Sequence, residues 1–174
     1  TRLLQLLLDL HAIGRVDLKG DDGVWIAQGR LTSAGREALK TLEAGGVVVR
    51  LVSPEENLIN DLLSAAAKPF IITGDYQITD AMVDQLNDRG VRLGINLDPQ
   101  KAQEFITRVE KAKQQLGERK NLFGYLTSVR GLEEARRPLY LGLIDSGWTH
   151  REICGGPEHQ GLLGGGNLGT LVGK

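Results

Sequence analysis

The chain has few residues that could form a disulfide framework, a metal cluster or a membrane span. Its only cysteine is Cys154, which excludes an intramolecular disulfide and a cysteine-rich zinc site. Its three histidines, His11, His150 and His159, are far apart in sequence. The most apolar stretch, residues 3–13, is interrupted by polar side chains and indicates a buried strand or a short helix. No run approaches the roughly 18 apolar residues that a membrane helix needs. We therefore expect no membrane span.

The chain also lacks an excess of charge of either sign. Its 21 Lys and Arg residues against 22 Asp and Glu give a formal net charge of −1, and no basic stripe is visible, which argues against nucleic acid as a partner. With 41% hydrophobic and 25% charged residues, the 174-residue chain has the composition of a folded globular protein. We expect one soluble domain over 1–174, with the cytoplasm as the favoured location. Because Thr1 rather than Met begins the sequence, we expect further residues upstream.

Short apolar, β-branched segments alternate along the chain with segments of helical pattern. The predicted strands are 3–9, 47–52, 70–73, 91–97 and 122–125. The predicted helices are 33–43, 53–67, 79–88, 98–116 and 131–146, followed by a short one from Thr149. No Asn-Gly hairpin turn joins the strands, so we expect a parallel sheet. The predicted fold class is α/β, with parallel strand–helix repeats forming a partial or reduced (β/α)8 TIM-barrel-like domain.

Start and stop signals flank several of the predicted helices. Ser33 is the predicted cap of the first helix, which Gly45 and Gly46 should end. The sequence SPEE at 53–56 has the pattern of a capping box with proline at the first helical position. The sequence THRE at 149–152 predicts a second capping box.

The carboxyl ends of barrel strands are where such a fold normally carries its chemistry. Here these positions hold Ser53, Gly74 and Leu126, none of which is a strong metal ligand or base. Ser53 has no histidine nearby in sequence, so we interpret it as a helix cap rather than a nucleophile. We expect no catalytic residues and no metal site. The residues that we predict to line a ligand site at the barrel mouth are Arg50, Ser53, Asp75, Tyr76, Asn96 and Tyr125.

Two interpretations of Arg50 stay open. An arginine facing into a barrel mouth could hold a carboxylate or a phosphate. It could instead pair with Asp75 or another acid in a structural network, which is the favoured interpretation.

Three further patterns favour structural roles. His150 and Cys154 lie four residues apart without a third ligand nearby, so we expect the histidine in the first helical turn and the cysteine packed inward. The acidic residues at 17, 21 and 22 lack the spacing of a calcium loop and predict a solvated turn. The glycines at 164–169 match a dinucleotide fingerprint in letters only, because too few residues follow them.

Several segments together resemble the membrane (renal) dipeptidase family, whose members are binuclear zinc hydrolases with a (β/α)8 barrel. GRLTSAGRE at 29–37 is similar to the family's G-L-T-x-x-G-R-E. GVVVRLVS at 46–53 is similar to its G-M-I-V-D-L-S-H. PFIITGD at 69–75 resembles P-V-I-A-S-H-S, and GVRLGIN at 90–96 resembles G-G-V-I-G-I-N. Closing pieces of similar order lie at 131–134, 146–149 and 165–168. The resemblance implies about the C-terminal two-thirds of the family's barrel.

The same resemblance implies that the zinc ligands are lost. The family's two metal-binding histidines fall on Ser53 and Gly74, and its last-strand aspartate falls near Leu126. The loop that supplies a substrate-binding arginine is shortened to residues 76–78, and the first-strand ligands would lie upstream of Thr1. No replacement ligand set is apparent, and a zinc-activated water needs a metal held by several ligands.

Three functional hypotheses follow. The favoured one is a dipeptidase-like protein without catalysis or cofactor, acting as a binding or assembly module. The alternative is an active metal-dependent dipeptidase or amide hydrolase that uses zinc and an upstream segment. A third makes the chain a structural partner, because an incomplete barrel leaves strand edges that another copy or another chain would cover.

Overall fold

The fold is known from a computed structural model, which describes residues 5, 8, 13–97, 101–116, 122–126 and 132–154. The chain divides into two compact units, 1–92 and 93–174. This division does not decide whether the units form one domain, so the expectation of a single domain stays a prediction. Gln5 and Leu8 are helical, so at both residues the short helix is right and the strand predicted over 3–9 is wrong. The rest of that stretch lies outside the described residues.

The first unit is built on three parallel strands. They are β1 (Arg15–Lys19), β4 (Val48–Val52) and β5 (Ile71–Thr73), with β4 in the middle. Asp17 is in register with Arg50, which is in register with Ile71. The predicted parallel pairing is therefore confirmed. Strand β1 was not predicted, because its Arg-Val-Asp-Leu-Lys sequence has only two apolar residues.

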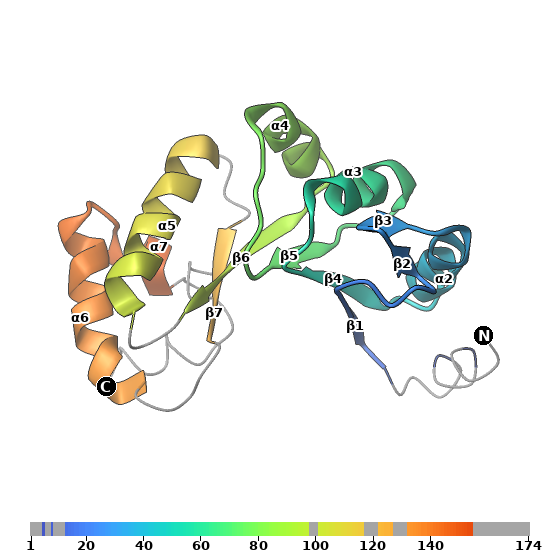
Figure 1. The fold of residues 1–174 in the computed structure, drawn as a ribbon. Helices are drawn as coiled ribbons and strands as arrows, with labels where there is room; N and C mark the ends of the chain where they lie inside the picture. The colour runs from blue at the N-terminus through green and yellow to red at the C-terminus, as the bar shows by residue number, and fades with distance from the viewer. Residues whose placement is uncertain are drawn as a thin grey trace. The chain divides into compact units, whose positions relative to one another are not determined.

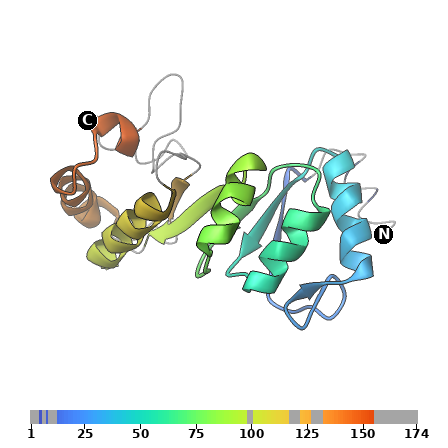
Figure 2. The same ribbon diagram turned by 90° about the horizontal axis from the view of Figure 1, so that it is seen from above.

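Three helices lie on one face of these strands (Figures 1 and 2). They are α2 (Ser33–Ala44), α3 (Glu56–Ala65) and α4 (Asp80–Asp88). Each buries an apolar stripe at helical spacing: Leu39 and Leu42 on α2, Ile59 and Leu62 on α3, Met82, Val83 and Leu86 on α4. The strands contribute Val49, Leu51 and Ile72, all at most 3% exposed. These side chains form the core of the first unit.

The ends of α2 and α3 differ from the sequence prediction in one respect each. Thr32, not Ser33, caps α2, and its Oγ1 accepts the Gly35 N–H at 3.0 Å. Helix α2 ends before Gly45 and Gly46, as predicted. Helix α3 begins at Glu56, so the capping box predicted from Ser53 is wrong, because Ser53 lies two residues before the N-cap position.

A short antiparallel hairpin, β2 (Ile26–Ala27) with β3 (Arg30–Leu31), follows β1. It was not predicted from the sequence. Its two turn residues, Gln28 and Gly29, have φ angles of 54° and 67°. Positive φ at both central residues is the type I′ combination, whose twist suits a two-residue hairpin. The sequence signal was Gln-Gly rather than the more usual Asn-Gly.

Asp61 on α3 holds this hairpin. Its carboxylate accepts two hydrogen bonds from the Arg30 guanidinium, at 2.9 and 2.8 Å, and one from the Leu31 N–H at 2.9 Å. Asp61 is 5% exposed. The hydrogen bonds from Arg30, more than any other interaction, hold the pKa of Asp61 below its ordinary value.

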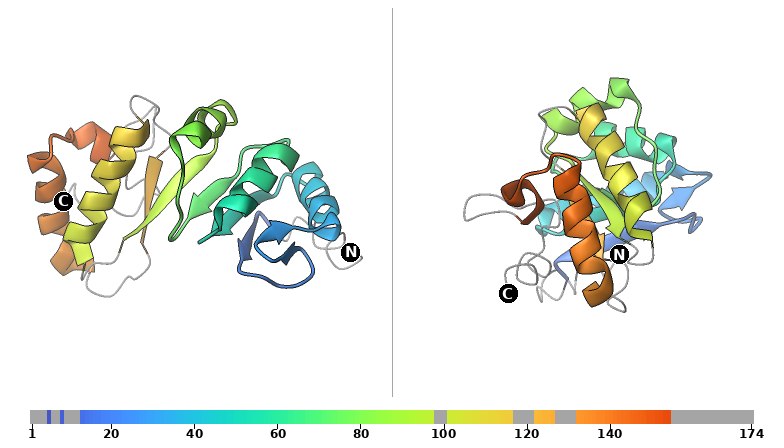
Figure 3. Two further views of the ribbon diagram at one scale, coloured as in Figure 1. Left: turned by 45° about the horizontal axis from the view of Figure 1, so that its top comes forward. Right: turned by 90° about the vertical axis from the view of Figure 1, so that its left-hand side faces the viewer.

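The second unit contains β6 (Arg92–Leu97), which begins at the boundary between the units, and β7 (Leu122–Leu126), which pair in parallel. Its helices are α5 (Ala102–Leu116), α6 (Leu132–Asp145) and α7 (His150–Cys154) (Figure 3). Their core contains Ile95, Phe105, Ile106, Val109, Leu139, Leu143, Trp148 and Ile153.

The predicted capping box of α7 is confirmed. The Thr149 N–H donates to Glu152 Oε2 at 2.7 Å, and the Glu152 N–H donates to Thr149 Oγ1 at 3.2 Å. The described elements thus make a mixed α/β fold of parallel strands joined through helices.

Candidate functional site

Three of the predicted site residues of the first unit, Ser53, Asp75 and Tyr76, follow the carboxyl ends of β4 and β5. Ser53 directly follows β4, and Gly74 directly follows β5. The Ser53 N–H donates to Thr73 O at 2.7 Å, and Ser53 Oγ accepts the Asp75 N–H at 3.1 Å. We call Ser53, Gly74, Asp75 and Tyr76 the strand-end site.

The backbone of the strand-end site is unusual. Ser53 has a φ of 50° and Gly74 a φ of 85°, so both lie in the left-handed region. Glycine adopts this region without cost, whereas serine is rare there. A Cβ atom on Gly74 would lie 2.3 Å from Ser53 Oγ. Ser53 therefore occupies the space that any side chain at position 74 would need.

The hydrogen bond that the Ser53 hydroxyl accepts from the Asp75 N–H explains why Ser53 does not cap α3. Its hydroxyl accepts a hydrogen bond across the strand ends, from the residue after Gly74, instead of from the first turn of the helix. Glu55 takes the N-cap position without a side-chain cap bond. The capping prediction assumed that the helix begins directly after Ser53. Instead, the left-handed backbone at Ser53 turns the chain before α3 begins at Glu56.

The residues at the strand ends do not fit a zinc ion. Zinc in proteins is held by Cys, His, Asp or Glu side chains. Ser53 offers a neutral hydroxyl that already accepts an N–H, Gly74 has no side chain, and position 126 is leucine. Within the described residues, no group of three or more His, Cys, Asp and Glu side chains could hold a metal ion.

Arg50 lies in the middle of β4 rather than at its end, which corrects the predicted placement. Its guanidinium makes two hydrogen bonds to Asp17, one from Nε to Oδ1 at 2.9 Å and one from Nη2 to Oδ2. Arg15 Nε lies 3.2 Å from the same Oδ1. The favoured interpretation, in which Arg50 pairs with an acid in a structural network, is confirmed, with Asp17 as that acid.

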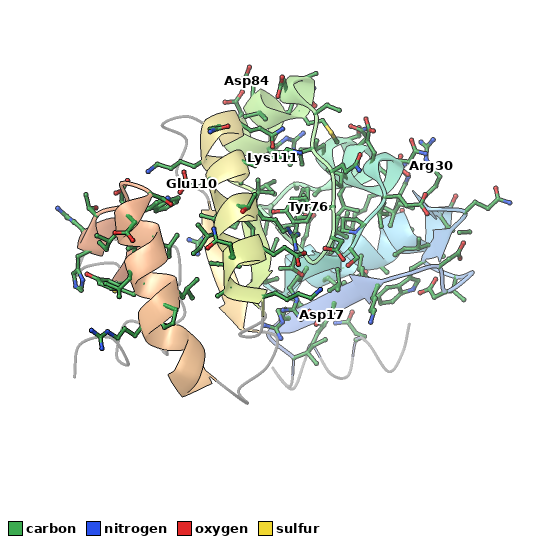
Figure 4. The ribbon with its side chains drawn as sticks, turned by 60° about the vertical axis from the view of Figure 1, so that its left-hand side comes forward. Asp17, Arg30, Tyr76, Asp84, Glu110 and Lys111 are labelled. Carbon is green, nitrogen blue, oxygen red and sulfur yellow. The ribbon has the colours of Figure 1, made fainter. Side chains whose placement is uncertain are left out.

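Asp75 is exposed and Tyr76 is half-buried in the segment between β5 and α4. Figure 4 shows Tyr76 and, on β1, Asp17. The other two predicted residues, Asn96 and Tyr125, belong to β6 and β7 of the second unit and are register partners. Their side chains lie outside the described part of the structure. The structure thus brings Ser53 and Asp75 together and pairs Asn96 with Tyr125 in register.

The acidic residues near β1 have separate roles. Asp22 Oδ1 accepts the N–H groups of Val24, Trp25 and Ile26 at 2.7–2.9 Å. These bonds, the one from Ile26 foremost, lower the pKa of Asp22. Asp21 accepts the N–H groups of Gly23 and Gln28. The predicted turn is confirmed for these two carboxylates, whereas Asp17 belongs to the Arg50 pair.

In α7, His150 occupies the first turn after Thr149, as predicted, and is exposed. Its Nδ1 lies 3.0 Å from Tyr140 Oη, a contact that the sequence did not indicate. Cys154 packs partly buried against the core of the second unit, and this burial raises the pKa of its thiol. The glycine-rich motif at 164–169 lies outside the described residues, as do His11 and His159.

Comparison of the chain with models of known protein families and with curated proteins gives no match. None of the helices in the described ranges combines the length and apolar character that crossing a membrane requires.

Proposed function

We propose that this chain is a partial (β/α) barrel, similar to the renal dipeptidase family, that has lost the zinc-holding residues and acts as a non-catalytic binding or assembly module. The topology of the described strands supports the barrel. Within each unit, consecutive strands of the repeat pair in parallel, β4 with β5 and β6 with β7. The helices α2, α3 and α4 lie on one face of their strands. A barrel covers one face with helices, whereas a doubly wound sheet covers both.

The observation that carries the non-catalytic part of the proposal is the contact between positions 53 and 74. The resemblance aligns both positions with metal-binding histidines, and they lie side by side at neighbouring strand ends. Ser53 Oγ lies where a side chain at position 74 would begin. An imidazole at 74 would therefore require a different residue at 53 and a different backbone. Ser53 and Gly74 therefore suit a tight turn of the backbone and do not suit two side-chain ligands of one metal ion.

The strand-end site offers polar groups that suit a small ligand or peptide. The Asp75 carboxylate is exposed, and Tyr76 presents a half-buried ring with a hydroxyl group. A ligand with an amine or amide donor and an apolar part would suit these two residues, each of which already interacts within the chain, so binding would exchange those contacts for contacts with the ligand. Arg50 is not assigned to the ligand in this proposal, because its guanidinium binds the Asp17 carboxylate on β1.

Zinc binding and hydrolysis test this proposal together. Purified protein is saturated with zinc, desalted and analysed for metal by mass spectrometry, and a dipeptide panel is assayed with and without added zinc. We expect no stoichiometric zinc and no cleavage. Ser53→Ala serves as a matched control, and we expect it to behave like the native chain in both assays, since its hydroxyl is assigned to the turn.

Stoichiometric zinc together with cleavage that a chelator abolishes would overturn the proposal and favour the active dipeptidase instead. A loss of that zinc in Ser53→Ala would place the metal at the strand-end site.

A further inference from the structure

The face of β1 and β4 that points away from the helices is charged. We call Arg15, Asp17, Lys19, Val48, Arg50 and Val52 the open face. Leu18, between Asp17 and Lys19, is 7% exposed on the helix side, and Val49 and Leu51 flank Arg50 on that same side at 3% and 0%. Alternation along the strands therefore places the charged residues on the opposite side. Val48 is 39% exposed there.

The open face carries an excess of positive charge among its described residues. Asp17 pairs with both Arg50 and Arg15, and Lys19 stands two residues further along β1. The acids that follow, at 21 and 22, direct their carboxylates to the N–H groups of their own loop. Arg15 and Lys19 are four residues apart, so their Cα atoms are separated by about 13 Å along the strand.

An acidic stripe of matching length lies on α4 of the same unit. Asp80, Asp84 and Asp88 recur every four residues and are all exposed. The apolar residues Met82, Val83 and Leu86 lie on the other side of the helix, and Asp84 lies on its outer side (Figure 4). Eight residues of helix span about 12 Å. Arg89, next to the stripe, directs Nη1 to Ala66 O at 2.6 Å.

One copy cannot join its own two surfaces. In the first unit, α4 lies with the other helices on one side of the strands (Figures 1 and 2), whereas strand alternation places the open face on the other side. When one surface of a molecule binds a different surface of an identical copy, the contacts are head-to-tail. Such contacts continue from copy to copy beyond a dimer, unless the copies close into a ring.

We propose that the open face binds the acidic stripe of α4 from a second copy of this chain, giving head-to-tail self-association. The inference rests on the proposed partial barrel, because in a closed barrel the open face would be the interior. Arg15 and Lys19 supply the positive charges, the exposed Val48 supplies an apolar contact, and Asp80 and Asp88 supply the negative charges. Contacts between exposed charges weaken with salt, so the association is expected to depend on ionic strength.

Charge reversal with mixing provides the test. Sedimentation velocity is run on the native chain, on Arg15→Glu/Lys19→Glu and on Asp80→Lys/Asp88→Lys, at about 50 and about 300 mM salt. The native chain should form species larger than a dimer at low salt, and its association constant should fall at least about tenfold at high salt. Each double variant alone should be monomeric. Their equimolar mixture should again form species larger than a dimer, because the acidic stripe of the first variant meets the basic open face of the second, and the reversed open face of the first meets the reversed stripe of the second.

The control is Lys40→Glu, which reverses an exposed charge on α2 that pairs with Glu37. It should leave self-association unchanged. Circular dichroism and urea midpoints show whether each variant is folded, and the neutral Lys19→Gln and Asp80→Asn variants replace any that is not, with a smaller loss of association in the same direction.

A native chain that stays monomeric at low salt would overturn the inference, and so would a mixture of the two variants that stays monomeric. If either result is obtained and the chain binds no zinc, the further inference fails while the proposed non-catalytic function is retained. Zinc-dependent cleavage by a chain that self-associates as described would instead remove the proposed function alone.

Discussion

The two faces of the sheet in the first unit are built from the same strands and yet have opposite chemistry. Val49 and Leu51 of β4 are almost completely buried under the helices, whereas Val48 and Arg50, their direct neighbours, lie on the open face. Charged residues on the helix side, such as Asp61, are paired with several donors. On the open face Asp17 is 37% exposed and pairs with two arginines.

This difference shows which features maintain the fold and which are available for interactions. Burial of apolar area and satisfied buried charges stabilise the helix side. Exposed ion pairs contribute little to stability, so the charges of the open face do little to maintain the fold.

Leu51→Ala should lower the free energy of unfolding by about 2–5 kcal/mol, because it leaves a cavity under the helices. Val48→Ala, on the same strand but on the open face, should lower it by less than about 1 kcal/mol. Urea denaturation of both variants measures the difference. Equal losses would mean that the two faces are buried alike, which would break the comparison.

Asp61→Asn should cost about 2–3 kcal/mol at neutral pH, because the loss of the carboxylate weakens the hydrogen bonds from Arg30 and Leu31. Asp17→Asn on the open face should cost about 1 kcal/mol or less. Both values come from urea denaturation, and Glu37→Gln on the surface of α2 is the control.

The Asp61 effect has a defined pH dependence. Folding lowers the pKa of Asp61 below its ordinary value of 3.8. The carboxylate therefore stabilises the fold fully above that value, and the contribution is lost as the pH falls through the lowered pKa. The difference between the native chain and Asp61→Asn should shrink below pH 3.8. A difference that stays constant down to pH 2, about two units lower, would contradict the role of the ionised carboxylate.

Gly74→Ala should cost about 1–2 kcal/mol, since it places a methyl group against Ser53 Oγ at a positive φ. Ser53→Gly removes the opposing hydroxyl and relieves the left-handed serine. In a double-mutant cycle, the cost of Gly74→Ala should be smaller in the Ser53→Gly background. Additive costs would show that the two residues do not share the space between the strand ends.

Arg50→Ala should cost about 1 kcal/mol or less and Arg15→Ala less than about 0.5 kcal/mol, because Arg50 is the less exposed partner of Asp17, at 18% against 50%. Both losses should decrease at high salt. A larger loss of stability for Arg15→Ala than for Arg50→Ala would show that Arg15, not Arg50, is the main partner of Asp17.

Helical periodicity predicted the described helices well, because each has a clear apolar stripe and a recognisable end. Gly45 and Gly46 ended α2, and Thr149 with Glu152 began α7, as local chemistry requires. The strand β1 and the hairpin at Gln28 and Gly29 escaped prediction. Strand β1 is stabilised by pairing with β4, and the hairpin by the bonds of Asp61, which come from 30 residues further along the chain.

For the strand-end site, the sequence predicted where the residues lie along the strands but not how they contact one another. The positions after β4 and β5 follow from strand boundaries, and the residue types there already indicate poor metal ligands. The left-handed turn at Ser53 could not be predicted, because a hydrogen bond to Asp75 across the strand ends replaces the cap that the local SPEE sequence favours. The partner of Arg50 was likewise undetermined, since register with β1 decides that the acid is Asp17.

The sequence by itself determined the alternation of strands and helices, most helix ends and the absence of strong ligands at positions 53, 74 and 126, since all of these depend on residue type and short-range spacing. Only the tertiary structure decided which strands pair, which acid meets Arg50 and how Ser53 fills the space beside Gly74. Those outcomes depend on contacts between residues more than 20 positions apart, and no local pattern encodes such contacts.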